Sequence, residues 1–170
     1  MCGSARTEEV YLRGLRDAAA NRAVDVTVVN RPKDPLKVVR SAVELAERGR
    51  RDFDQVWCVF DVDDFDIASA VRAAKQQGVE LAVSNPCFEL WLLLHHEACN
   101  GHCRGCGAVM PKLKKHVKGY DKSRPRFADF SAGVVDACDR ARALDPTGNA
   151  FGANPSSSVW RLVETIVEAS

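Results

Sequence analysis

The sequence predicts an α/β fold with a doubly wound parallel sheet and a helical C-terminal part. Helix and strand patterns alternate along residues 7–96, which is the order that builds such a sheet. The stretch QVWCVF at residues 55–60 is a continuous apolar run, typical of a strand that is covered on both faces. A length of 170 residues corresponds to a single domain.

Capping residues and apolar periodicity give the elements of the first part of the chain. They predict, in order, a helix capped by Thr7 with Tyr11 and Leu15 on its apolar face, a strand at 23–30, a helix opened by Asp34 and Pro35, a strand at 55–60, a helix at 67–77 closed by Gly78, and a strand at 79–83.

The second part is predicted to be helical. In order it contains a strongly apolar helix at 88–96 that Asn85 would cap and Pro86 would open, a Gly- and Cys-rich loop at about 101–111, a helix at about 132–144, a loop at 148–152, and a last helix opened by Asn154 and Pro155. The stripe from Val159 to Val167 marks the buried face of that last helix.

Charge and hydropathy exclude several classes of protein. The net charge of +1 gives no overall attraction to nucleic acid or to a membrane surface. No apolar run is long enough to span a bilayer, and the N-terminus lacks the apolar core of a secretory signal. We therefore expect a cytoplasmic protein without membrane contacts.

Two carboxylates follow the strand at 55–60. Asp61 and Asp63 are alternate residues of an extended segment, so both side chains can point to one place. Open α/β sheets bind their ligands at the carboxyl ends of the strands. Converging carboxylates suit Mg²⁺ or Mn²⁺, which prefer oxygen ligands. The alternative is an acidic turn that caps the next helix.

A second set of polar residues follows the strand at 79–83. Ser84 and Asn85 lie at its end, and Glu89 lies one turn into the apolar helix SNPCFELWLLL. A carboxylate among apolar residues is costly unless it is paired or belongs to a site. Glu89 is thus either a site residue or a structural residue bonded to backbone donors.

The cysteines indicate a metal site more than a disulfide scaffold, because their number is odd and the expected compartment is reducing. His95, Cys99, Cys103 and Cys106 have spacings that allow tetrahedral zinc binding with all four positions filled by protein. The alternative is a loop of reduced free thiols. Cys58, Cys87 and Cys138 lie in apolar surroundings and are expected to be buried thiols.

A basic stretch follows the cysteine-rich loop. It runs from Lys112 to Arg126, includes Lys114 and Lys115, and is interleaved with Tyr120. Such a stretch can contact a nucleic-acid backbone, although a solvated helix face has the same composition.

Four segments together resemble the RloB family: CGSARTEEVYLRGL, VWCVFDVDDFD, AVSNPCFELWLLLHHE and NPSSSVWRLVE. The resemblance covers nearly the whole chain. It implies a Rossmann-like, TOPRIM-type parallel sheet flanked by helices, with the first strand truncated. Within this single RloB-like domain, residues 1–98 would form the α/β core, 99–111 the candidate zinc loop and 112–170 the C-terminal helices.

The resemblance also implies a function. Proteins of this family are encoded near restriction-modification loci, are linked to phage defence, and often accompany an AAA-type ATPase called RloA. TOPRIM-like sites hold Mg²⁺ with a Glu after the first strand and an Asp-x-Asp after a later one, for phosphodiester chemistry. Asp61 and Asp63 match the Asp-x-Asp. Apart from the resemblance, the position of Asn85 at the end of the strand at 79–83 suits it to orient a ligand or water.

The chain departs from the family at the other carboxylate, because Gly3 and Ser4 stand where the family has Glu and Gly. Losing a general acid or base costs about a hundredfold to ten-thousandfold in rate. Either Glu8 or Glu89 supplies the missing carboxylate, or the metal site persists with reduced activity. The third alternative is a catalytically degenerate binding or sensor subunit that docks to the ATPase.

Overall fold

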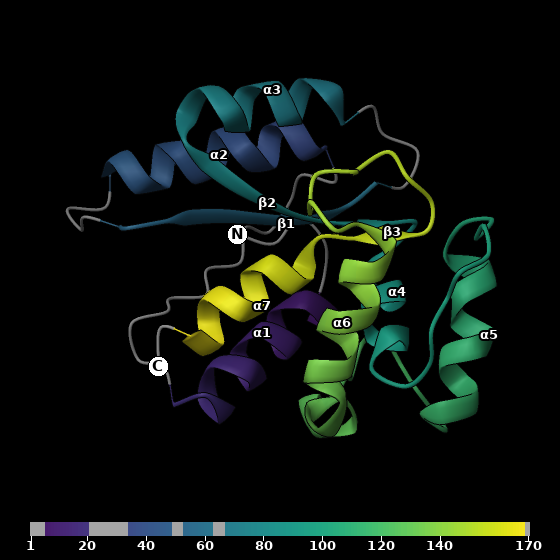
Figure 1. The fold of residues 1–170 in the computed structure, drawn as a ribbon. Coiled ribbons are helices and arrows are strands. Elements are labelled where there is room, and N and C mark those ends of the chain that lie inside the picture. Colours follow the sequence, from purple (N-terminus) through teal and green to yellow (C-terminus); the bar gives the residue numbers. More distant parts are fainter. Residues whose placement is uncertain (1–5, 21–33, 49–52, 63–66, 169–170) are drawn as a thin grey trace.

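The computed structural model describes residues 6–20, 34–48, 53–62 and 67–168, which form a mixed α/β fold that is mostly helical. Seven α-helices and three strands lie in these residues (Figure 1). They are α1 (Arg6–Ala18), α2 (Pro35–Arg48), β1 (Val56–Asp61), α3 (Ala68–Gln77), β2 (Val79–Asn85), α4 (Phe88–Leu94), α5 (Cys106–His116), α6 (Val134–Leu144), β3 (Ser156–Ser157) and α7 (Val159–Glu168), with the short 3-10 helices η1 (Phe127–Asp129) and η2 (Ser131–Gly133) before α6.

The sheet has the strand order β1-β2-β3 within the described residues. β1 and β2 are parallel, as the sequence predicts. In the observed register Val56 lies opposite Val79 and Asp61 opposite Ser84. The two-residue strand β3 pairs antiparallel with the end of β2. The sequence did not predict β3, because it assigned these residues to the last helix. The strand predicted at 23–30 lies outside the described residues.

Helices cover both faces of the β1–β2 pair, which explains why these strands are continuously apolar. Helices α2 and α3 lie on one face, and α1, α4 and α7 lie on the other (Figure 1). Successive side chains of a strand point to opposite faces. Accordingly, Cys58 and Phe60 pack with α2 and α3, whereas Val59 joins the larger cluster on the other face.

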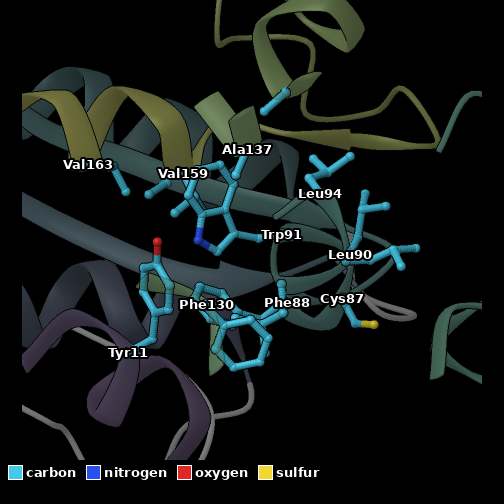
Figure 2. Packing of buried hydrophobic residues seen from close by; sticks show 14 of the residues in the cluster. Tyr11, Cys87, Phe88, Leu90, Trp91, Leu94, Phe130, Ala137, Val159 and Val163 are labelled. Carbon is cyan, nitrogen blue, oxygen red and sulfur yellow. The ribbon is translucent and has the colours of Figure 1, made fainter. Parts of the chain in front are cut away.

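Helix α4 lies at the centre of that larger cluster. All seven of its residues are buried, among them Phe88, Leu90 and Trp91 (Figure 2). Contacts with β2, α5 and α6 surround it. Although α4 is the most apolar helix by composition, it is short, and no helix in the described part of the chain has the length and apolar composition needed to cross a bilayer.

Several predicted helix boundaries are confirmed. Asp34 caps α2, since its Oδ1 accepts the backbone N–H of Leu36 at 3.0 Å. Gly78 ends α3 with a left-handed conformation, φ 65°, and its N–H donates to the carbonyl of Ala74.

Other predicted boundaries are wrong. Thr7 lies inside the first turn of α1, and the N-cap of α4 is Cys87, so Asn85 does not cap that helix. The predicted loop at 101–111 is helical from Cys106 onward, with Pro111 inside α5. The last helix begins at Val159, after β3, instead of at Pro155.

His95 is part of the core, although the sequence assigned it to a zinc site. Its Nδ1–H donates to the Trp91 carbonyl at 2.9 Å, because a carbonyl can only accept. Its Nε2 therefore accepts a hydrogen bond from the hydroxyl of Tyr11, also at 2.9 Å. Both ring nitrogens are thus occupied within the core. Burial lowers the pKa of His95 from 6.5 to about 4, so the ring is neutral in the folded protein.

Gly14 of α1 and Gly107 of α5 provide a matched pair of helical glycines. A Cβ at Gly14 would overlap the side chain of Phe127 in η1, whereas a Cβ at Gly107 would meet nothing within 4 Å. We expect Gly14→Ala to lower the free energy of unfolding by about 1–3 kcal/mol through overpacking. Gly107→Ala should leave it unchanged or raise it by up to about 1 kcal/mol. Urea unfolding of both variants checks this, and equal losses would contradict the close packing of α1 on η1.

The neutral His95 makes stability depend on pH. The unfolded chain takes up a proton near pH 6.5, whereas the folded protein does so only near pH 4. Since the unfolded state binds more protons between these values, the free energy of unfolding should fall as the pH drops from 6.5 to 4, by about 3 kcal/mol. Urea unfolding across this range should show that the dependence is shallower in His95→Gln than in the wild type. Parallel curves would show that another group is responsible.

Candidate functional site

The carboxyl end of the β1–β2 pair carries several of the predicted site residues. Asp61 ends β1 opposite Ser84, and the backbone N–H of Val62 donates to the Ser84 carbonyl at 3.0 Å. Asn85 is the next residue of β2, and its Nδ2 donates to the Phe151 carbonyl at 3.3 Å. Asp61 and Asn85 therefore share one edge of the sheet. The predicted partner of Asp61, Asp63, lies outside the described residues.

Glu89 is a buried carboxylate in the first turn of α4, with 2% of its surface exposed. Lys122 compensates its charge, with Nζ 2.9 Å from Oε2. The hydroxyl of Tyr120 donates to Oε1 at 3.3 Å, and the Sγ of Cys106 lies 3.1 Å from Oε2. The carboxylate thus has partners at both oxygens, as a charge at this depth requires.

The first turn of α1 lies against the same segment. Glu8 is 1% exposed, and the hydroxyl of the adjacent Thr7 donates to the Lys122 carbonyl at 3.2 Å. Burial, followed by the negative charges of Glu89 and Glu8, raises the pKa of Tyr120. Tyr120 therefore stays protonated and remains a hydrogen-bond donor. The structure brings the two predicted assisting carboxylates, Glu8 and Glu89, near one tyrosine.

Sequence reasoning missed the role of Tyr120 and Lys122. Both fall in the basic stretch, for which the sequence allows either contact with a nucleic-acid backbone or a solvated surface. The available signal was Glu89 itself, because a carboxylate in an apolar helix predicts a buried partner. The identity of the donor depends on the tertiary fold, because Tyr120 follows Glu89 by 31 residues in the sequence.

The predicted zinc ligands are not gathered in one place. Cys106 is paired with Cys87 in a disulfide, which corrects the expectation that Cys87 is a free thiol. The sulfurs of Cys99 and Cys103 lie 3.4 Å apart, and His95 is occupied in the core. Cys58 and Cys138 are buried and free, as expected.

A different group of potential metal ligands is present instead. Donor atoms of Cys87, Glu89 and Cys106 all lie within 4.8 Å of one another. Cys87 and Glu89 are buried and Cys106 is partly exposed. The sequence offered one clue to this group, since Cys87 and Glu89 stand two residues apart in SNPCFE.

The basic residues Lys114 and Lys115 are exposed in the last turn of α5. Cys106 begins the same helix, so Lys114 lies about 12 Å from it along the helix axis. The two lysines form a cationic surface on α5 without joining the buried group around Glu89.

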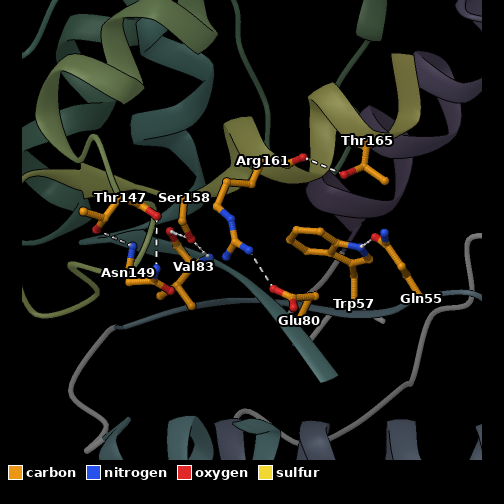
Figure 3. Close-up of polar contacts among 9 residues, drawn as sticks. All are labelled: Gln55, Trp57, Glu80, Val83, Thr147, Asn149, Ser158, Arg161 and Thr165. Atoms are coloured by element: carbon orange, nitrogen blue, oxygen red, sulfur yellow. Dashed lines mark hydrogen bonds and ion pairs between the residues drawn. The ribbon is translucent and has the colours of Figure 1, made fainter. Parts of the chain in front are cut away.

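A cavity of about 440 Å³ lies at the opposite end of the strands, and Trp57, Glu80 and Arg161 are among its lining residues. Arg161 donates to Glu80 Oε2 at 2.8 Å, and its guanidinium lies 5.4 Å from the centre of a Trp57 ring (Figure 3). Trp57 and Asp61 are separated by about 13 Å along β1. The cavity is therefore separate from the predicted site.

Comparison with known proteins identifies the family. The model of the RloB-like protein family matches residues 1–166. No curated protein and no solved structure matches the chain significantly. Because the family model covers nearly the whole chain, the chain belongs to the RloB-like protein family.

Proposed function

We propose that this member of the RloB-like family is a metal-dependent nuclease component of a prokaryotic anti-phage, abortive-infection system. Its reaction would be hydrolysis of a phosphodiester bond in nucleic acid, on a TOPRIM-type, Rossmann-like core. The observation that carries the proposal is the position of Asp61. It ends one of two parallel strands, beside Ser84 and Asn85 at the end of the other, where open α/β sheets bind ligands.

In this proposal Asp61 and Asp63 hold Mg²⁺ or Mn²⁺, which suits their oxygen ligands. When bound, the metal would activate the attacking group and stabilise charge on the phosphate. Asn85 would orient a ligand or water at the same sheet edge. Lys114 and Lys115 are exposed and can contact phosphates of the substrate backbone.

Glu8 and Glu89 are the candidates for the carboxylate that Gly3 does not provide. Both are buried, and each lies in the first turn of a helix. Glu89 is already compensated by Lys122 and oriented by Tyr120. Glu89 is therefore suited to orienting groups of the site, and either Glu8 or Glu89 would supply the carboxylate for proton transfer.

The second candidate function is a catalytically degenerate subunit that senses a signal or docks to an AAA-type ATPase such as RloA. Two observations favour it. Gly3 stands where the family resemblance places a Glu. In addition, Lys122 and Tyr120 engage Glu89 on both oxygens, so this carboxylate carries out a structural task.

We expect the protein, together with its ATPase partner, to cleave DNA, tRNA or other RNA only when Mg²⁺ or Mn²⁺ is present. Asp61→Asn should reduce cleavage about a hundredfold or more, because metal binding contributes several kcal/mol of charge stabilisation. Gel assays of the three substrates with and without chelator provide the measurement. Asp139→Asn is the control, since Asp139 is exposed on α6 and pairs with Arg142.

Calorimetry with Mg²⁺ and Mn²⁺ separates the two functions. A nuclease should bind metal, and Asp61→Asn should weaken that binding. A wild-type protein that binds neither ion and cleaves none of the three substrates, even with the ATPase, would contradict the nuclease proposal. The docking subunit would then be supported by metal-independent binding to the ATPase.

A further inference from the structure

The proposed nuclease function uses Glu89 but not the two sulfurs that lie beside it, those of Cys87 and Cys106. Cys87 caps α4, Glu89 follows in its first turn, and Cys106 begins α5. Two sulfurs and a buried carboxylate oxygen thus meet between two helices, all within 4.8 Å of one another. In the structure the sulfurs form a disulfide.

Reduction of this disulfide changes the electrostatics of the group. A dithiol reductant would supply two electrons and two protons, giving two thiols while the reductant forms its own disulfide. Lys122 Nζ lies 3.4 Å from Cys106 Sγ, and the N-terminus of α5 also favours a negative charge there. A divalent cation that binds both sulfurs would displace the two thiol protons to the solvent. The two thiolates and Glu89 would then carry three negative charges against the single positive charge of Lys122, which favours retention of the cation.

The ligand types indicate which cation fits. Two thiolates and a carboxylate are ligands of zinc, whose bonds to them measure about 2.0–2.3 Å in tetrahedral sites. Ligand atoms of such a site are about 3.5 Å apart, and Cys106 Sγ already lies 3.1 Å from Glu89 Oε2. Breaking the disulfide lets the two sulfurs separate to van der Waals distance, which is close to the separation that zinc requires.

We propose that the reduced protein binds one zinc ion through Cys87, Glu89 and Cys106, and that disulfide formation releases it. On oxidation the two thiolates pass two electrons to the oxidant and form the S–S bond, and Zn²⁺ leaves with its charge unchanged. Among the described residues no fourth His, Cys, Asp or Glu atom joins the group, so water would fill the fourth position. The proposal does not require nuclease activity, although it shares Glu89 with the proposed nuclease function.

The other cysteine pair is less suited to this role. Burial and the contact with Cys99 raise the pKa of the Cys103 thiol to about 11, which favours the protonated form. Asn154 also fixes Cys103, because its side chain bonds to both the backbone N–H and the carbonyl of that residue, at 2.9 and 3.0 Å. Cys99 and Cys103 therefore provide a matched control with the same number of sulfurs.

Cobalt(II) is the probe, because bound thiolates give it an intense charge-transfer absorption. The protein is reduced with dithiothreitol, desalted without oxygen and titrated with Co²⁺, and the bound Co²⁺ is then displaced with Zn²⁺. We expect one equivalent to bind with the thiolate band. Cys87→Ser and Cys106→Ser should each weaken binding about 10–100-fold or more, and the double variant Cys99→Ser/Cys103→Ser should retain it. Glu89→Gln should keep the band but bind more weakly.

Oxidation tests the second half of the proposal. Diamide, which takes two electrons from the thiolates and two protons from the solvent, should release the metal in step with loss of two reactive sulfurs, as measured with a zinc indicator and a thiol reagent. The proposal is overturned if the reduced wild type binds no metal. It is equally overturned if binding survives in both Cys87→Ser and Cys106→Ser, or disappears only in the Cys99/Cys103 variant. Circular dichroism of each variant confirms that it is folded, and the partly exposed Cys106 gives a second variant if Cys87→Ser does not fold.

Discussion

The burial of the Glu89 carboxylate in an otherwise apolar helix is the constraint on which the arrangement of the site depends. An ionised carboxylate at 2% exposure costs several kcal/mol unless charge and hydrogen bonds compensate it. Lys122 and Tyr120 provide that compensation from the segment after α5. Thr7 ties the same segment to α1. One buried charge thus brings together the beginnings of α1 and α4 and the segment after α5, which are distant in the sequence.

This convergence lies on one side of the β1–β2 pair, and α2 and α3 cover the other side with a separate apolar cluster. The strands thus separate the polar groups around Glu89 from that apolar cluster. The side of the sheet that α2 and α3 cover is packed with apolar side chains. The carboxyl ends of the strands present Asp61 and Asn85, while α4 carries Glu89 from the end of β2 into the larger cluster.

Much of this architecture follows from local sequence signals. Apolar runs and capping residues predict β1, β2, α2 and α3, since Asp34 and Gly78 act through neighbours only two to four residues away. Helix α5 was missed, because Gly105, Gly107 and Pro111 have the composition of a loop while its buried face depends on packing against α4.

The candidate site was predictable only in part, for the same reason. Asp61, Asn85 and Glu89 could be named from their positions at strand ends and in an apolar helix. The pairing of Cys87 with Cys106 spans 19 residues, and the Tyr120–Glu89 bond spans 31. For His95 the sequence predicts a ligand that the structure does not place in a metal site. Its spacing to Cys99 fits such a site, but its side chain bonds to Tyr11, 84 residues away. Residue type and spacing indicate candidate ligands, whereas tertiary contacts decide which of them lie together.

A double-mutant cycle between Glu89 and Lys122 tests the central role of the buried carboxylate most directly. The free energy of unfolding would be measured in urea for the wild type, Glu89→Gln, Lys122→Met and the double variant, all in the disulfide form. If the ammonium compensates a buried charge, Lys122→Met should be much less destabilising when Glu89 is already neutral, giving a coupling energy of about 1–3 kcal/mol. Additive effects, within about 0.5 kcal/mol, would contradict the account.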